Sequence, residues 1–179
     1  MMGIEIERRF LVKNEDWKSK VLLSENFSQA YLASNPNEWT TRVRIINNNQ
    51  AFLTLKSTIN ELVNYEFEYE IPLKDAIELF NLSKYKIAKT RYQVKINKKY
   101  WVVDSFYGSN SSLKIAEIEL SSESEEVEIP SWCDQEITGI KSLSNASLAK
   151  TPISKESIKD RLKNKDAKQK GNPSFRLSL

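Results

Sequence analysis

Residues 65–71 read YEFEYEI, a strict alternation of apolar and acidic residues from which the fold can be predicted. Successive side chains of a β-strand point to opposite faces, so this segment would place Glu66, Glu68 and Glu70 together on one face. Like charges two residues apart lie about 7 Å from one another, which is mildly repulsive and gives no structural benefit. The pattern therefore favours a strand whose acidic face serves a function.

The same period of two residues recurs on both sides of this segment. We expect eight strands, at Glu5–Val12, Gln29–Leu32, Thr41–Ile46, Ala51–Ser57, Tyr65–Ile71, Ala88–Ile96, Tyr100–Phe106 and Lys114–Leu120. Helical patterns are fewer, at Asn14–Leu22, Asp75–Leu82, Asn145–Lys150 and Ser154–Lys168. The sequence predicts one antiparallel α+β domain over residues 1–152, followed by a basic helix and tail over residues 153–179.

Composition excludes several classes of site. The 179 residues contain no histidine and a single cysteine, Cys133, which removes histidine-dependent triads, histidine-ligated zinc and a disulfide framework. Early charges such as Glu5 and Arg8 leave no room for the apolar core of a signal peptide, and no run approaches the roughly 20 apolar residues of a membrane helix. We expect a cytoplasmic protein with no membrane partner.

The net charge of +3 is unevenly distributed. Residues 150–179 carry nine basic and three acidic side chains, whereas residues 1–149 are net acidic. The basic excess lies in a tail that has few aromatic or arginine side chains, and these are the groups that read RNA. We therefore expect no nucleic-acid partner.

The charged faces of the expected strands segregate by sign. Some strands are acidic and others basic, and their opposite faces are apolar enough to be covered by helices. The acidic set is Glu5, Glu7, Glu66, Glu68, Glu70, Glu117 and Glu119, and the basic set is Arg42, Arg44, Lys56, Lys89 and Arg91.

Two interpretations of these faces are open from the residues alone. In the first, the charges face water on an ordinary antiparallel sheet. In the second, the strands form a closed or nearly closed eight-stranded barrel with the charges inside, which leaves room for one small ligand. Buried charges of both signs are costly without a ligand, but they suit a polyanion with a divalent metal ion. Carboxylates favour Mg²⁺ or Mn²⁺, and arginine pairs favour phosphate oxygens.

The ordered motifs resemble a known family. Residues 5–9, EIERR, resemble the opening Glu-x-Glu-x-Lys signature of the CYTH superfamily, the triphosphate tunnel metalloenzymes. The resemblance covers residues 1–152 and continues through Tyr31-Leu32, Arg42-Val43-Arg44, Leu53-Thr54-Leu55-Lys56, Glu68-Tyr69-Glu70-Ile71-Pro72, Lys89-Thr90-Arg91-Tyr92, Asp104-Ser105-Phe106, Ala116-Glu117-Ile118-Glu119-Leu120 and Glu136-Ile137-Thr138-Gly139. Within the superfamily, the chain is similar to small bacterial-type inorganic triphosphatases.

This resemblance implies a charged eight-stranded tunnel that hydrolyses a triphosphate, most simply inorganic tripolyphosphate to pyrophosphate and phosphate. It implies Mg²⁺ or Mn²⁺ as cofactor, a small-molecule triphosphate as partner, and a monomer or homodimer. The implied metal ligands are Glu5, Glu7, Glu117 and Glu119. The implied phosphate-binding residues are Arg9, Arg42, Arg44, Lys56, Lys89 and Arg91. The implied catalytic residues are Lys89, Glu68, Glu70 and Asp104.

Two departures from the family pattern affect these expectations. Arg9 stands where the signature has lysine, which keeps the charge but changes the geometry of the donors. Val102 stands where family members often carry a second acid before Asp104, which leaves open whether the site would hold one metal ion or two. Lys89 could act as a general base or could only bind phosphate.

Other functions remain open at this point. A class IV-type adenylate cyclase or a thiamine triphosphatase would use the same tunnel, and a non-catalytic module would bind polyphosphate or nucleotides without turnover. The presence of both acidic pairs argues against the non-catalytic module, since phosphate binding alone requires no metal carboxylates.

Overall fold

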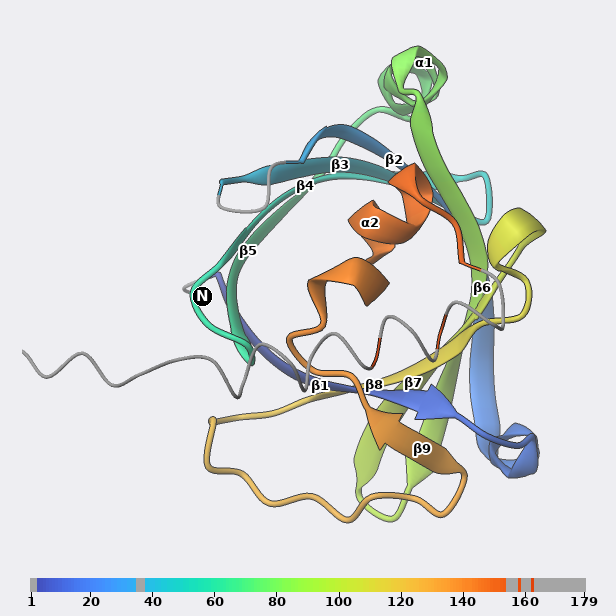
Figure 1. The fold of residues 1–179 in the computed structure, drawn as a ribbon. Helices are drawn as coiled ribbons and strands as arrows, with labels where there is room; N and C mark the ends of the chain where they lie inside the picture. Colours follow the sequence, from blue (N-terminus) through green and yellow to red (C-terminus); the bar gives the residue numbers. More distant parts are fainter. Residues whose placement is uncertain (1–2, 35–37, 154–157, 159–161, 163–179) are drawn as a thin grey trace, which may run out of the picture.

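The computed structural model describes residues 3–34, 38–153, 158 and 162. Within these residues, nine strands form one antiparallel sheet in the order β5-β4-β3-β2-β6-β7-β8-β1-β9, and β5 also pairs with β1. That pairing closes the first eight strands into a barrel (Figure 1). The strands are β1 Ile4–Val12, β2 Val21–Ser34, β3 Thr40–Ile46, β4 Gln50–Thr58, β5 Val63–Glu70, β6 Tyr85–Ile96, β7 Lys99–Phe106, β8 Lys114–Glu119 and β9 Cys133–Glu136.

The strand register brings the charged faces together inside the barrel. Residues directly opposite on neighbouring strands share a face. Arg9 of β1 lies opposite Glu117 of β8, and Arg91 of β6 lies opposite Asp104 of β7. The predicted closed barrel is therefore confirmed, and the alternative of an open sheet with its charges in water is wrong.

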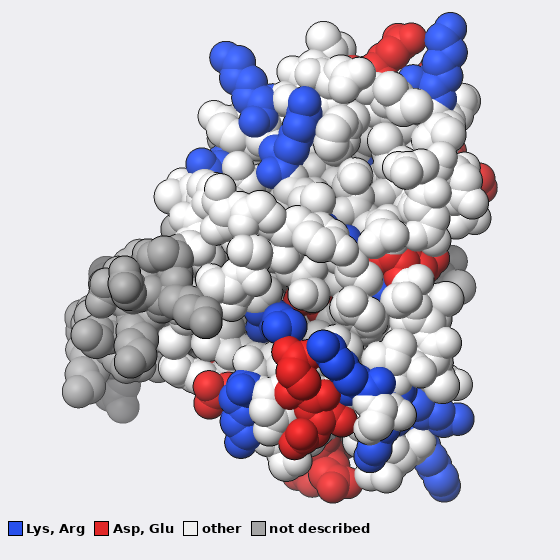
Figure 2. Space-filling model, turned by 90° about the vertical axis from the view of Figure 1, so that its right-hand side faces the viewer, with Lys and Arg blue, Asp and Glu red and all other residues white. Residues whose placement is uncertain are grey.

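Apolar residues cover most of the outside of the barrel. The helix α1, Leu73–Leu82, packs against β3 and β4 around Val43, Ile45 and Ala51. A second cluster on the outer faces of β1 and β6–β8 includes Trp101, whose ring centroid lies 5.7 Å from that of Trp132. Figure 2 shows the side next to β6, where uncharged residues dominate the centre and charged side chains gather toward the ends.

The helix α2, Asn145–Lys150, lies at one end of the barrel and contacts β6 and β2 (Figure 1). Its Leu148 packs with Phe106 and Ile115, which share the inner face with Lys89 and Asp104. One end of the lumen is therefore apolar and filled by the segment around α2, while the rest is charged. The sequence indicated helices over the apolar outer faces of the strands, and it did not indicate that α2 closes one end of the lumen.

Two further expectations about elements are wrong. The predicted helix Asn14–Leu22 is a short 3₁₀ helix at Asp16–Lys20, after which β2 begins at Val21. The strand predicted at Gln29–Leu32 thus lies within the second half of a 14-residue strand. Its first half was missed because pairing with β6 outweighs a weak local helix pattern, and the register shift between Val21 and Leu23 disturbs its alternation.

The short strand β9 was not predicted, because four residues are too few to show a period. It pairs with β1 across a register shift. The expected helix Ser154–Lys168 lies outside the described residues, except for positions 158 and 162. In the part of the chain that the structure describes, no helix has the length and apolar character needed to span a membrane.

Candidate active site

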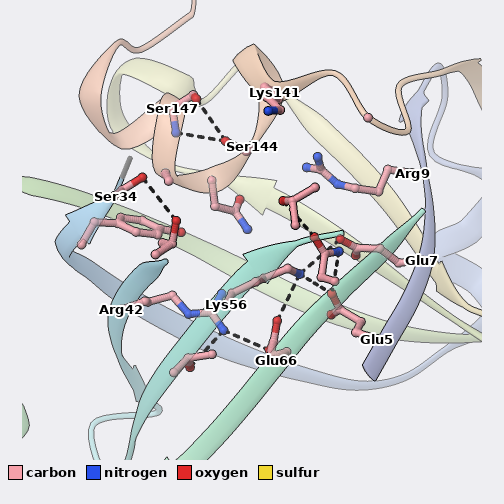
Figure 3. Close-up of a pocket in the computed structure, with 18 of the residues that line it drawn as sticks. Glu5, Glu7, Arg9, Ser34, Arg42, Lys56, Glu66, Lys141, Ser144 and Ser147 are labelled. Atoms are coloured by element: carbon pink, nitrogen blue, oxygen red, sulfur yellow. Dashed lines mark hydrogen bonds and ion pairs between the residues drawn. The ribbon is translucent and has the colours of Figure 1, made fainter. Parts of the chain in front are cut away.

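A cavity of about 760 Å³ occupies the charged part of the lumen, within the range typical of small-ligand sites. Its walls are the inner faces of the strands together with residues 139–150, the segment that includes α2 (Figure 3). Eight of the site residues implied by the resemblance line it, namely Glu5, Glu7, Arg9, Arg42, Arg44, Lys56, Arg91 and Glu117.

Three carboxylates surround one ammonium on the β1, β4 and β5 side of the cavity. Lys56 Nζ donates to Glu5 and lies 3.4 Å from Glu7 Oε1 and 3.1 Å from Glu66 Oε2. We call these four residues the Lys56 cluster, and Figure 3 shows Glu5 and Glu66 converging on the lysine. Burial raises the pKa of Glu5 to about 7, with the Lys56 ammonium opposing this rise and the Glu7 carboxylate adding to it. The cluster carries a local excess of negative charge.

Two arginines of β3 form the adjoining wall. Arg42 Nη2 lies 3.5 Å from a carboxylate oxygen of Glu66 and of Glu68, and Arg44 Nη1 lies 3.1 Å from Glu68. Thr54 connects them, because it accepts from Arg42 at 3.2 Å and donates to Glu68 at 2.7 Å. The Nε groups of both arginines are buried, and no acceptor among the described residues reaches them. Burial and the neighbouring Arg42 lower the pKa of Arg44 to about 10.

A second charged group closes the floor of the cavity. Arg91 donates through Nε and Nη2 to the two oxygens of Asp104, at 2.8 and 2.7 Å, and Nη2 also donates to Glu117 at 2.6 Å. Lys89 Nζ donates to Asp104, and both of these side chains are 0% exposed. We call Asp104, Lys89 and Arg91 the Asp104 cluster. Its ammonium also lies 5.9 Å from the ring centroid of Phe27, where the aromatic face attracts a cation.

The two titratable groups that flank Arg91 respond in opposite ways. Burial, followed by repulsion from Arg91, lowers the pKa of Lys89 to about 8. Burial alone would raise the pKa of Glu117, but the charges of Arg91, Lys89 and Arg9 outweigh burial and hold that pKa well below its usual range. Glu117 is therefore a carboxylate at neutral pH despite its burial.

The remaining implied residues do not line the cavity. Lys89 and Asp104 are sealed beneath it, and Glu68 borders it through its arginine pairs. Glu70 and Glu119 are exposed residues at the ends of β5 and β8. Val102 lies opposite Glu117 in the β7–β8 register, so the position from which a second acid would face Glu117 is apolar, as the sequence indicated.

Several lining residues were missed by the sequence-based prediction. Glu66 belongs to the acidic alternation of residues 65–71, but the motif used for the site set begins at Glu68. Thr54 and Asn64 are neutral, so no charge pattern marks them, although Asn64 Nδ2 donates to Glu5 at 3.3 Å. Residues 139–150 lie beyond the alternating strands, and nothing in their sequence indicates that they enter the barrel.

The donor chemistry of the Lys56 cluster fits a hard divalent cation, because its acceptors are carboxylate oxygens alone. In the described residues, no three acidic or cysteine side chains are arranged so that they could hold a metal ion, and the carboxylates are directed at Lys56 and Arg91 instead. The Lys56 ammonium stands where the negative charge converges. The carboxylates of this cluster are therefore chemically suited to a metal ion, provided that the Lys56 ammonium moves away from them.

Comparison with known proteins agrees with this architecture. The family model of the CYTH domain matches residues 3–152. An inorganic triphosphatase of Acetivibrio thermocellus is 36% identical over 153 residues, which cover 84% of this chain and 96% of the relative.

Solved structures give the same result. The inorganic triphosphatase NE1496 matches with a TM-score of 0.62 and 29% identity, covering 84% of this chain and 97% of that one. The PH1012 protein of Pyrococcus horikoshii matches with a TM-score of 0.54 and 26% identity, covering 67% and 80%. The CYTH family model matches most of the length of the chain, and the structure is a closed barrel with a charged lumen. The chain therefore belongs to the CYTH domain family.

Proposed function

We propose that this protein hydrolyses triphosphates, most directly inorganic tripolyphosphate to pyrophosphate and phosphate, with Mg²⁺ or Mn²⁺. The observation that carries the proposal concerns Arg42 and Arg44, which line the cavity: their buried Nε groups have no acceptor in the described part of the chain. Unsatisfied donors on buried cations are expensive, and a polyanionic ligand would satisfy them. The activity of the Acetivibrio relative and the metal dependence general to CYTH triphosphatases support the same reaction.

The basic residues would bind and orient the substrate. Phosphate oxygens would accept hydrogen bonds from Arg42, Arg44 and Arg91, and from Lys56 once its ammonium leaves the carboxylates. Arginine suits this work because its planar fork matches two phosphate oxygens. These cations would also stabilise the charge that builds on the leaving pyrophosphate.

Carboxylates that line the cavity would hold the metal ion. Glu5, Glu7 and Glu117 line the cavity and are the first candidates, and the resemblance adds Glu119. A metal ion held there would supply polarisation of the phosphoryl group and help in activating water. Asp104 contributes differently, because it holds Lys89 and Arg91 in place from beneath the cavity.

The resemblance implies a role for Lys89 either as a general base or as a phosphate-binding cation. Because Lys89 is sealed beneath the cavity, either role requires its pair with Asp104 to open toward the substrate. The pH dependence of hydrolysis separates the two roles. As a general base it must be neutral, so kcat/KM would rise as the pH passes its pKa of about 8. As a phosphate-binding cation it must be charged, so kcat/KM would fall over the same range. In Lys89→Met this ionisation is absent. The change in kcat/KM with pH that disappears in this variant, a rise or a fall, is therefore the one caused by Lys89.

The test is phosphate release from tripolyphosphate, ATP and thiamine triphosphate, each with Mg²⁺ or Mn²⁺ and with chelator. We expect metal-dependent turnover of tripolyphosphate, a loss of about 100-fold or more in Glu117→Gln, and a strong rise in KM in Arg42→Ala. Glu126→Gln is the matched control, because Glu126 is exposed and does not line the cavity.

Three outcomes would contradict the proposal. Parental turnover in Glu117→Gln would remove that residue from the metal site. Tight binding of tripolyphosphate without turnover would show a non-catalytic module. Formation of cyclic AMP from ATP would show the cyclase reaction.

A further inference from the structure

Two nitrogens of the Arg9 guanidinium donate to other parts of the chain, while the residue also lines the cavity. Its side chain is 10% exposed, its Nε donates to Glu117 at 3.2 Å, and its Nη2 donates to the backbone carbonyl of Leu143 at 3.0 Å. The first acceptor belongs to the tunnel wall on β8. The second lies in residues 139–150, a segment that forms another wall of the cavity. One guanidinium thus joins two walls.

The backbone of the same residue is also fastened to the chain that leads into this segment. Arg9 N donates to Thr138 Oγ1 at 3.0 Å, and its carbonyl accepts from Ile137 N at 2.8 Å. The Thr138 hydroxyl donates in turn to Glu136 at 2.7 Å. Glu136 accepts both Nε and Nη2 of Arg8, at 3.0 and 2.7 Å. The attachment runs continuously from β1 to the start of residues 139–150.

The contact at Leu143 lies where the segment enters the barrel end. Leu143 is fully buried, and the next residue, Ser144, caps α2 by accepting from Ser147 N. Ser144 and Ser147 line the cavity, as does Lys141. The position of the Leu143 carbonyl therefore decides where these polar side chains stand relative to the arginine wall.

We propose that Arg9 is a positioning residue that fastens residues 139–150 across the tunnel and so fixes one wall of the substrate cavity. Its guanidinium is required because two separated nitrogens serve two acceptors, whereas a lysine offers one nitrogen on a shorter side chain. This gives a physical reason for arginine at the position where the family signature has lysine. The kinetic part of the proposal rests on the proposed function, but the structural part does not.

The structural part is tested on the ligand-free full chain by amide hydrogen exchange read by mass spectrometry. Arg9→Lys should speed exchange in residues 139–150 by about tenfold or more, the size of one lost hydrogen bond to a charged group. Arg44→Lys is the matched control, since Arg44 contacts Glu68 and Phe27 and should leave this exchange at the parental rate.

Thr138→Val provides a second variant that changes no charge in the tunnel. Thr138 does not line the cavity, so a direct effect on phosphate binding is excluded. We expect the same faster exchange, together with a KM for tripolyphosphate raised about threefold to tenfold at nearly constant kcat. The same split between KM and kcat is expected in Arg9→Lys.

The outcomes separate this proposal from the proposed function. Hydrogen exchange at the parental rate in both Arg9→Lys and Thr138→Val would overturn the positioning role. If KM rises in Arg9→Lys and in Arg44→Lys but not in Thr138→Val, Arg9 is a phosphate ligand instead. If Arg9→Lys fails to fold, Thr138→Val decides. If no form of the protein hydrolyses tripolyphosphate, the proposed function fails while the exchange result still stands.

Discussion

The lumen holds two charged clusters of opposite composition. In the Lys56 cluster one cation serves three carboxylates, and their side chains are 17–26% exposed. In the Asp104 cluster one fully buried aspartate serves two cations, and its partner Lys89 is equally buried. The same residue types thus form an open anionic group and a cationic group whose Lys89–Asp104 pair is sealed from solvent.

The difference in burial indicates that the two clusters have different roles in the site. A sealed ion pair is held by strong interactions in a low dielectric, and removal of one partner leaves an uncompensated charge. Such a group is fixed before the substrate arrives, which suits electrostatic preorganisation. The open cluster is partly solvated, so its carboxylates can exchange one cation for another. We infer that the Asp104 cluster sets the geometry and that the Lys56 cluster takes part in ligand exchange.

The largest effect on stability is expected from the sealed group. Asp104→Asn keeps the shape but leaves Lys89 and Arg91 without their shared counter-charge, so the free energy of unfolding should fall by about 3–5 kcal/mol. Glu66→Gln, the matched change in the open cluster, should cost about 1 kcal/mol or less, because Lys56 retains Glu5 and Glu7. Urea denaturation measures both. Equal losses in the two variants would show that burial does not distinguish the clusters.

A smaller effect is expected when the cation of the open cluster is removed. Lys56→Gln leaves three carboxylates together, so Mn²⁺ should bind about tenfold more tightly and raise the melting temperature more than in the parent protein. Titration calorimetry and thermal denaturation with and without metal measure this gain. Lys99→Gln is the control, because Lys99 pairs with Glu125 on the exposed surface. An unchanged metal affinity in Lys56→Gln would exclude this cluster as the place of exchange.

The sealed cluster also predicts a dependence of stability on pH. The folded pKa of Lys89 is about 8, below the ordinary lysine value of about 10.4. Between these values the unfolded chain binds more protons than the folded chain, so the free energy of unfolding rises with pH across this window. Lys89→Met should lack this rise. Denaturation of both proteins at several pH values measures the difference, and identical slopes would contradict a lowered pKa.

Much of the barrel could be predicted because its charged faces alternate along single strands. The eight strands and the inward direction of Arg42, Lys56 and Glu117 follow from a period of two residues combined with ordered motifs. What could not be predicted depends on long-range packing. Residues 139–150 enter the lumen through apolar contacts of Leu143 and Leu148, and such contacts have no periodic signature in so short a segment.

The same limit applies to neutral site residues and to the pairing of charges. Thr54 acts only because β4 places it between Arg42 and Glu68, and a lone threonine is common in strands that bind nothing. Lys56 and Lys89 also look alike in the sequence, since both are lysines on inward faces. Their exposed fractions, 26% against 0%, follow from the closed end of the barrel and not from the residues themselves.

The smallest effect is expected at the exposed margin of the open cluster. Glu119 lies opposite Glu7 in the β1–β8 register, but it is exposed and does not line the cavity, whereas Glu117 is held there by Arg91. Solvent screens a carboxylate at such a position, so Glu119→Gln should lower kcat/KM for tripolyphosphate by about threefold or less, far below the loss in Glu117→Gln. Steady-state kinetics of the two variants at saturating Mn²⁺ measures the ratio. Comparable losses of kcat/KM in the two variants would mean that the ligand-exchanging group extends to Glu119 at the end of β8. A carboxylate that acts only through a screened charge cannot have as large an effect as one in direct contact with the ligand.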